Sequence, residues 1–147
     1  GDPESFEIEG IKIYAIPDYA YRSGDMLHIH DWKAGRARSS HEEQLAIYAL
    51  WAKVKHGLEP ERMRGFVEYL ALRQVLPVEM DDDRVQRVLD RISESVGDMR
   101  EYLEDGDLRN NRPLPQDVWE LAETPSICRR CNFYELCEPE LKREGLI

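Results

Sequence analysis

The sequence predicts an α/β (α+β) fold in which a mixed sheet of about four to five strands is flanked by helices. Apolar and polar residues alternate along residues 6–32 with the period of two that is typical of strands. Two later segments, 40–57 and 81–103, keep helical spacing instead, and a strand-like segment, 64–80, separates them. A chain of 147 residues has room for one core of this class.

The first strands are expected to form a hairpin. Ile11, Ile13 and Ala15 share one face by alternation, and the strand pattern resumes from Met26 to His30. Between the two runs, Arg22-Ser23-Gly24-Asp25 has the composition of a tight turn. With Ser23 and Gly24 as its central residues, Arg22 pairs with Asp25, which fixes the register of the hairpin.

A helix is predicted from Ser40 to Gly57. Ser40 is suited to cap this helix, Glu43 completes an S-x-x-E capping box with it, and Gly57 is placed to end the helix. Apolar side chains occur nearly all round the helix, which indicates that it is largely buried. These apolar residues are Leu45, Ile47, Leu50, Trp51 and Val54.

The next segment is rich in Val, Tyr, Leu and Phe, and is expected to supply two more strands, Gly65 to Leu72 and Gln74 to Glu79. A second helix is then expected to begin at Asp81, with its apolar residues on one face. Beyond this helix, Asn and Pro residues indicate irregular structure before the cysteines. We therefore expect a core over residues 1–106 and a C-terminal segment over residues 107–147.

The charge balance excludes a protein that coats DNA non-specifically. The chain has 30 acidic and 20 basic residues and a formal net charge of −10, so any contact with DNA must be local. The positive candidates are Lys33, Arg36 and Arg38, then Arg62 and Arg64, then Arg129 and Arg130. No apolar run is long enough to span a bilayer, and the N-terminus lacks the pattern of a signal peptide. We therefore expect a cytoplasmic protein with no membrane partner.

Asp31 and Lys33 form the first candidate catalytic pair. Residues two apart in a strand point to the same side, so this carboxylate and this ammonium group stand side by side. In the register given above, Asp18 lies opposite Ile29 and diagonal to Asp31, which puts the two carboxylates on the order of 7 Å apart. Two carboxylates at that separation can share one divalent ion, with the lysine beside them.

This set of residues suits phosphodiester hydrolysis. Hard oxygen ligands hold Mg²⁺ or Mn²⁺, which polarises the phosphate and activates a bound water, and a lysine can orient that water or offset developing charge. The alternative is an exposed strand, in which an Asp-x-Lys pattern often occurs by chance. The placement favours catalysis, because these polar groups interrupt a face that Leu27 and Ile29 would otherwise bury.

Three motifs then carry a resemblance to a known family. They are Ile16-Pro17-Asp18, then His30-Asp31-Trp32-Lys33-Ala34-Gly35, then Gln44 with Tyr48. In order and spacing they resemble the second motif, the third motif and the Gln-x-x-x-Tyr motif of the RecB-like branch of the PD-(D/E)XK nucleases. The resemblance implies a restriction-endonuclease-like core and a DNA nuclease, with exonuclease action expected, in DNA repair, recombination or CRISPR adaptation.

The resemblance also implies a role for each motif residue. The residues implied to bind the metal are Asp18, Asp31 and, through its backbone carbonyl, Trp32. Lys33 would serve the attacking water. Gln44 and Tyr48 lie one turn apart on the same face of a helix, and would position DNA beside the site. The alternative for this last pair is a core tyrosine with a nearby amide.

Two departures from the family pattern stand out. Ala15-Ile16-Pro17 occupies the place of a glycine-containing turn, which the edge of a strand tolerates. The family's first motif, a helix with a metal-binding His or Glu, should precede residue 11, and ten residues lie there. His28 and His30 do not replace it, since alternation puts both on the face away from Asp31. We therefore expect the natural protein to continue upstream.

Three cysteines, Cys128, Cys131 and Cys137, form a compact cluster near the C-terminus. In a reducing compartment this spacing favours a metal over a disulfide, and both zinc and an iron-sulfur cluster normally take four ligands. AddB-like and CRISPR-associated members of the RecB-like branch bind a 4Fe-4S cluster through three cysteines of this spacing and one far upstream. The resemblance thus implies a 4Fe-4S cluster. Zinc, or three free thiols, remains the alternative.

Two other functions compete with the nuclease. The first is a catalytically incomplete DNA-binding or scaffolding module with a structural metal site, against which Asp18, Asp31 and Lys33 argue. The second, a zinc-ribbon-like interaction protein, needs a second cysteine pair that the sequence lacks. The sequence also has no G-x-x-x-x-G-K-[ST] phosphate loop, so a helicase or other repair subunit would be a separate domain or partner.

Overall fold

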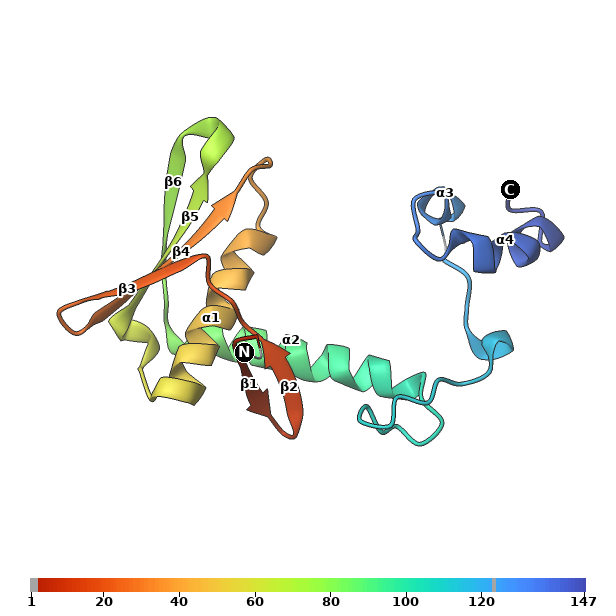
Figure 1. Ribbon diagram of the computed structural model, residues 1–147, viewed down its shortest axis with the longest axis horizontal. Helices are drawn as coiled ribbons and strands as arrows, with labels where there is room; N and C mark the ends of the chain where they lie inside the picture. The colour runs from red at the N-terminus through yellow and green to blue at the C-terminus, as the bar shows by residue number, and fades with distance from the viewer. Residues whose placement is uncertain (1–2, 123) are drawn as a thin grey trace. The chain divides into compact units, whose positions relative to one another are not determined.

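The structure is a computed structural model that describes residues 3–122 and 124–147 (Figure 1). The chain divides into two compact units, one up to Ser95 and one from Val96 onward, and each unit is described by itself. The first unit contains the six named strands and helix α1 (Ser40–His56), and helix α2 (Asp82–Glu101) begins in it.

Four strands form the central sheet of the first unit, in the order β3 (Tyr19–Ser23), β4 (Met26–Lys33), β5 (Met63–Tyr69) and β6 (Gln74–Glu79). β3 pairs antiparallel with β4, β4 parallel with β5, and β5 antiparallel with β6. The parallel pair needs a crossover connection, which α1 supplies. β1 (Ser5–Ile8) and β2 (Ile11–Tyr14) form a separate hairpin. The predicted α/β class with a mixed sheet is confirmed.

The register of the β3–β4 hairpin differs from the predicted one. Ser23 pairs with Met26, so the two turn residues are Gly24 and Asp25. Gly24 has a φ of 62°, a conformation that glycine adopts at little cost and that two-residue hairpin turns require. The predicted pairing of Arg22 with Asp25 is therefore wrong. The slip is two residues, which keeps every side chain on its predicted face.

Helix α1 buries Leu45 and Leu50 as predicted, but Val54, which was also predicted to be buried, is 49% exposed. The helix also begins differently. Ser39 is its N-cap and makes no side-chain capping bond, and the carboxylate of Glu43 pairs with Arg91. The predicted capping box between Ser40 and Glu43 is therefore wrong. Gly57 ends the helix with a φ of 61°, which confirms the predicted end. The buried residues of α1 are Leu45, Ala46, Tyr48, Ala49, Leu50 and Ala52.

At Gly65 of β5, α1 and the sheet approach each other closely. A Cβ atom at this position would lie 2.8 Å from Leu45 Cδ1 and 2.8 Å from Met80 Cε. Such distances are shorter than van der Waals contact, so only glycine fits without movement of its neighbours. Ile29 of β4 and Val67 of β5 belong to the same core.

The remaining elements of the first unit follow the sequence prediction in part. β5 ends at Tyr69, because a 3-10 turn, Leu70–Leu72, and a left-handed Arg73 reverse the chain where the strand was predicted to continue. β6 has the predicted bounds. Helix α2 starts one residue after Asp81, whose Oδ1 accepts a hydrogen bond from the amide of Arg84, so Asp81 caps the helix.

The second unit is largely irregular from Tyr102 to Ala122, with one isolated bridge between Leu103 and Pro113 and a short 3-10 helix, Gln116–Val118. Two helices follow, α3 (Pro125–Cys128) and α4 (Tyr134–Arg143). α4 was not predicted from the sequence, and Pro139 lies inside it, although proline disfavours helix interiors. Leu141 of α4 is fully buried.

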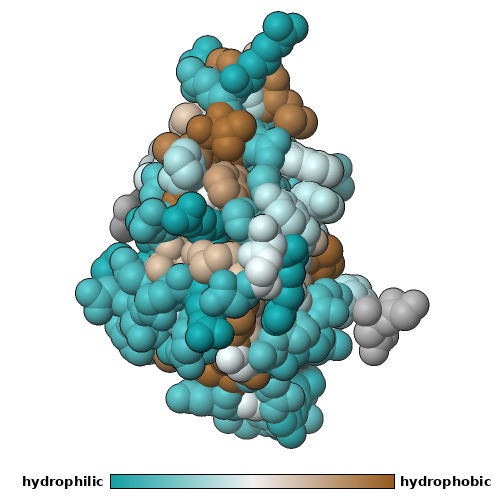
Figure 2. All heavy atoms as spheres, turned by 90° about the vertical axis from the view of Figure 1, so that its left-hand side faces the viewer, coloured by the Kyte–Doolittle hydropathy of each residue, from teal (hydrophilic) through white to brown (hydrophobic). Residues whose placement is uncertain are grey.

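The sheet face opposite Asp31 carries a group of aromatic rings. His28 stacks on Tyr21 with ring centroids 4.8 Å apart, and His30 stacks on Phe66 at 4.6 Å. Both histidines therefore face away from Asp31, as alternation predicted. Figure 2 shows hydrophilic residues over most of one side of the molecule, with hydrophobic residues in separate patches. No helix in the described part of the chain has the length and hydropathy needed to cross a membrane.

Candidate active site

Asp31 is the residue around which the candidate site is built. It follows Leu27 and Ile29 on the inner face of β4, and its side chain is 1% exposed. Among the described residues, Asp31 is the one residue of a charged type that is buried. A buried carboxylate is costly unless other groups compensate its charge, so its contacts indicate what the site does.

Asp18 approaches Asp31 from the preceding segment of the chain. Its Oδ2 accepts a hydrogen bond of 2.7 Å from the backbone amide of Trp32, the residue after Asp31. Tyr19 pairs with His30, and the same register continued by one position brings Asp18 level with Asp31. The predicted register, in which Asp18 lay opposite Ile29, is therefore wrong, because the turn lies one residue later than predicted.

Lys33 lies beside Asp31 and also contacts α1. Its Nζ is 2.6 Å from Asp31 Oδ2 and donates a hydrogen bond of 2.6 Å to Gln44 Oε1. The contact with Asp31 is an ion pair by distance, but its angles do not make a hydrogen bond, and Oδ2 is buried without a hydrogen-bond donor. This oxygen therefore keeps free lone pairs beside the lysine.

Gln44 and Tyr48 connect Lys33 back to Asp31. Gln44 Nε2 donates a hydrogen bond of 2.7 Å to the Tyr48 hydroxyl. That hydroxyl lies 3.2 Å from the Ile16 carbonyl and 3.5 Å from Asp31 Oδ1, and its single proton must be shared between these two acceptors. Asp31, Lys33, Gln44 and Tyr48 therefore form a closed set of contacts, which we call the polar ring.

The protonation of Tyr48 suits its place in the polar ring. Burial raises the pKa of its hydroxyl to about 12, and the negative charge of Asp31 adds to this increase. The hydroxyl therefore keeps its proton at neutral pH and remains a donor. Its side chain is 4% exposed, so its polar contacts are with the protein itself.

Sequence reasoning missed two further residues at this place. His41 Nδ1 lies 3.1 Å from the hydroxyl of Tyr69, and Tyr69 is the neighbour of Lys33 across the β4–β5 pair. His41, Gln44 and Tyr48 follow the i, i+3, i+7 spacing of one helix face. The position of His41 one turn before Gln44, on the helix face that also carries Tyr48, is the signal that could have found it.

The donor set of the site fits a hard divalent cation. Asp31 Oδ2 is an anionic oxygen that lacks a hydrogen-bond donor, and Asp18 adds a second carboxylate next to it. Carboxylate oxygens are the ligands that Mg²⁺ and Mn²⁺ prefer. The Trp32 peptide also lies at the site, since its amide contacts Asp18, whereas its side chain is 47% exposed.

A second group of carboxylates lies elsewhere in the first unit. Glu59, Glu61 and Asp82 are exposed, and their oxygens lie within 4.8 Å of one another. Lys53 Nζ is 2.5 Å from Asp82 Oδ1 and 3.4 Å from Glu59 Oε2. A lysine therefore already neutralises part of this cluster, which makes it an exposed ion-pair group rather than a counterpart of the polar ring.

The three cysteines lie in the second unit and are all free thiols. Cys128 ends α3 and is buried, Cys131 is exposed, and Cys137 lies in α4. Cys131 Sγ accepts a hydrogen bond of 3.4 Å from the amide of Phe133. Among the described residues, the one group of three potential ligand atoms that lie within 4.8 Å of one another is the carboxylate cluster described above. The sulfur atoms of the three cysteines therefore do not lie that close together.

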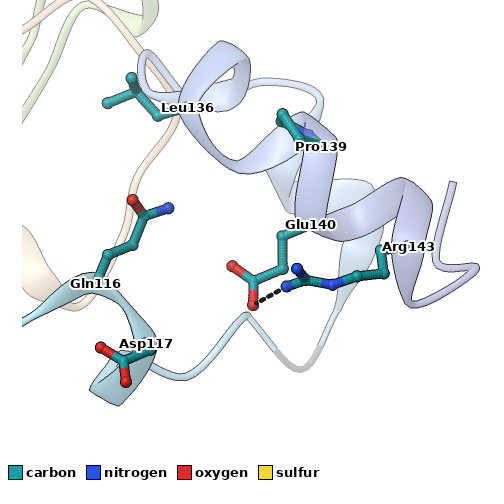
Figure 3. A pocket seen from close by; sticks show the side chains of 6 residues that line it. All are labelled: Gln116, Asp117, Leu136, Pro139, Glu140 and Arg143. Carbon is teal, nitrogen blue, oxygen red and sulfur yellow. Dashed lines mark hydrogen bonds and ion pairs between the residues drawn. The ribbon is translucent and has the colours of Figure 1, made fainter.

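A pocket of about 400 Å³ also lies in the second unit (Figure 3). Glu140 and Arg143 of α4 form an ion pair of 3.1 Å along one side of it, and Gln116 and Asp117 lie across from them. Leu136 and Pro139 complete its lining. None of the residues predicted to act in catalysis or to bind a cluster lines this pocket.

Comparison with known proteins identifies a family for the chain. Residues 2–138 match the family described as PD-(D/E)XK nuclease superfamily. A search of curated proteins found no significant match. The family match covers both the polar ring and the three cysteines.

Proposed function

Because the chain belongs to the PD-(D/E)XK nuclease superfamily, we propose that it is a metal-dependent nuclease domain that hydrolyses phosphodiester bonds in DNA. We further propose exonuclease action in DNA repair, recombination or CRISPR adaptation, in the cytoplasm and together with a helicase or other repair subunit. One observation carries the proposal. Asp31 is buried, keeps an oxygen without a donor, and stands 2.6 Å from Lys33.

The residues of the site divide the chemistry between them. Asp18 and Asp31 would hold Mg²⁺ or Mn²⁺, with the Trp32 carbonyl as a further ligand, and such an ion supplies Lewis-acid activation of the phosphate and of water. Lys33 carries a positive charge at the same place, where it orients the attacking water and stabilises the negative charge that develops on the phosphate. The polar ring holds Lys33 and Asp31 in one geometry.

The substrate assay follows directly from this proposal. The full chain is incubated with linear duplex DNA, linear single-stranded DNA, circular single-stranded DNA and RNA, in Mg²⁺, Mn²⁺ or EDTA. Shortening of linear DNA from its ends in Mg²⁺ or Mn²⁺, absent in EDTA and on the circle, is the expected result. DNA binding without cleavage in either metal would instead favour the catalytically incomplete DNA-binding module.

We expect Tyr48→Phe to lower kcat about tenfold and to leave the KM for DNA unchanged. The change removes one hydroxyl from the polar ring, and a hydrogen bond to a charged group contributes about 1.5 kcal/mol, which corresponds to about tenfold in rate. Because Tyr48 is 4% exposed, we place its action on Asp31 and Gln44 rather than on DNA. Steady-state kinetics on a labelled oligonucleotide measure both constants.

Tyr14→Phe serves as the control for this experiment, since Tyr14 lies on β2 and is 58% exposed. The control should leave both constants unchanged. A raised KM with an unchanged kcat in Tyr48→Phe would instead show direct contact with DNA, which is the role that the Gln-x-x-x-Tyr resemblance implies.

We also propose that Cys128, Cys131 and Cys137 supply three ligands of a 4Fe-4S cluster, with zinc as the alternative metal. The fourth ligand would come from a cysteine outside these three. Protein in which a fourth cysteine ligand is available, purified without oxygen, should be brown and bind about four irons. The protein comprising only these 147 residues should not, because it has three cysteines.

Iron and acid-labile sulfide are measured in both proteins and in a Cys131→Ser variant. The variant should lose most of its iron, because the cluster loses a thiolate ligand. Zinc without iron, or no metal in any of the proteins, would contradict the iron-sulfur proposal. Neither result bears on the polar ring, whose ligands are oxygens.

A further inference from the structure

A second pocket, in the first unit, lies where the N-terminal halves of α1 and α2 face each other. Its volume is about 340 Å³. Ala46 and Val88, both buried, form an apolar part of its lining. The other lining residues are polar or charged and come from both helices: Ser39, Glu42, Glu43, Arg84, Arg87 and Arg91. We call this space the arginine pocket.

Three arginines of the pocket form one stripe on α2. Arg84, Arg87 and Arg91 are three and four residues apart, which puts them on the same face of the helix. Two carboxylates of α1 oppose them. Arg84 Nη1 lies 3.2 Å from Glu42 Oε2, and Arg91 pairs with Glu43.

The pocket has more hydrogen-bond donors than its own acceptors can satisfy. Arg87 forms none of the ion pairs found among the described residues, although it stands between the two paired arginines. Arg84 Nε is buried without an acceptor in the described part of the chain. Three guanidinium groups against two carboxylates leave one positive charge and several N–H groups without a partner.

The surroundings of the pocket strengthen its attraction for an anion. α1 begins at the pocket, and its N-cap Ser39 makes no side-chain capping bond. The positive end of the helix dipole therefore adds to the charge of the arginines.

We propose that the arginine pocket binds an oxyanion, and that in this protein the anion is a backbone phosphate of a nucleic acid strand. Guanidinium groups bind phosphate through paired N–H donors, which matches the surplus in the pocket. The nucleic acid as the source of the phosphate rests on the proposed nuclease function. The pocket would anchor the strand at a phosphate other than the one that is cleaved.

The test compares Arg87→Ala with Arg22→Ala, which removes the same charge from an exposed residue of β3 outside the pocket. Binding of the full chain to single-stranded and duplex oligonucleotides is measured in EDTA, where no cleavage occurs, over a range of salt concentrations. Arg87→Ala should weaken binding about three- to tenfold and lower the salt slope by about one, because one phosphate contact is lost. Equal effects of the two variants would overturn the proposal.

Glu43→Gln gives a change in the opposite direction. It releases Arg91 from its ion pair, so it should tighten oligonucleotide binding several-fold. A purely structural ion pair would give a lower melting temperature with no gain in binding, and that result would also overturn the proposal.

Competition with inorganic phosphate tests whether the anion that binds in the pocket is a phosphate of the nucleic acid strand. If phosphate competes with the oligonucleotide in the wild-type chain and not in Arg87→Ala, the pocket binds a strand phosphate as proposed. If phosphate binds through Arg87 but does not affect the oligonucleotide, the nucleic acid assignment is wrong. Because binding is measured without cleavage, an inactive chain that still shows the Arg87 effect would refute the nuclease function alone.

Discussion

Replacement of Asp31 by Asn is expected to lower the rate of metal-dependent cleavage at least about 1,000-fold. The amide has nearly the shape of the carboxylate but lacks its charge, so it cannot act as an anionic ligand. The Oδ2 atom that stands free beside Lys33 is lost with it. A 1,000-fold loss corresponds to about 4 kcal/mol of transition-state stabilisation, which is within the range of a metal ligand.

The assay for Asp31→Asn pairs cleavage with two measurements of structure. Thermal unfolding shows whether the variant is folded, and binding of Mn²⁺ by the folded protein shows whether the ligand is lost. Asp25→Asn, in the turn of the same hairpin, is the control and should keep full activity. A folded Asp31→Asn protein that cleaves at the wild-type rate would exclude Asp31 as a catalytic ligand.

Lys33→Ala is expected to lower kcat about 100- to 1,000-fold and to reduce stability. The variant removes the positive charge beside the phosphate, a loss of the size seen when one electrostatic donor is removed from an active site. It also leaves Asp31 buried without its ion partner and Gln44 Oε1 without its donor. A buried group without its partner costs about 1–3 kcal/mol of unfolding free energy.

The choice of assay temperature separates the effect of Lys33→Ala on kcat from its effect on stability. Cleavage is measured well below the melting temperature of the variant, so that the loss of stability does not contribute to the loss of rate. Lys12→Ala, at an exposed position of β2, is the control for loss of a lysine and should change neither quantity. Full activity of Lys33→Ala in the folded state would remove the lysine from the mechanism.

The fold could be predicted where local patterns determine it. The bounds of β6, the cap of α2 at Asp81 and the end of α1 at Gly57 each follow from residues close in the sequence. The hairpin register could not be predicted securely, because Ser23-Gly24 and Gly24-Asp25 are both acceptable turn pairs. The side chains still lie on the predicted faces of the sheet, because a slip of two residues preserves the alternation of a strand.

In the candidate site, too, some contacts follow from local sequence patterns and others depend on tertiary packing. Asp31 and Lys33 could be placed side by side from strand periodicity alone. The contact of Lys33 with Gln44 depends on the angle at which α1 packs across the sheet. The spacing of residues in the sequence does not predict this angle. The contact of His41 with Tyr69 has the same origin, because the two residues meet only after the crossover has formed.

The geometry of the candidate site depends on the close approach of α1 to the sheet at Gly65, a residue that has no functional group. The missing side chain lets Leu45 and the helix that carries it lie directly on the sheet. Gln44 directly precedes Leu45 in that helix, so the distance between its amide and Lys33 depends on this spacing. A side chain at position 65 would therefore disturb the polar ring as well as the core, although Gly65 itself makes no contact in that ring.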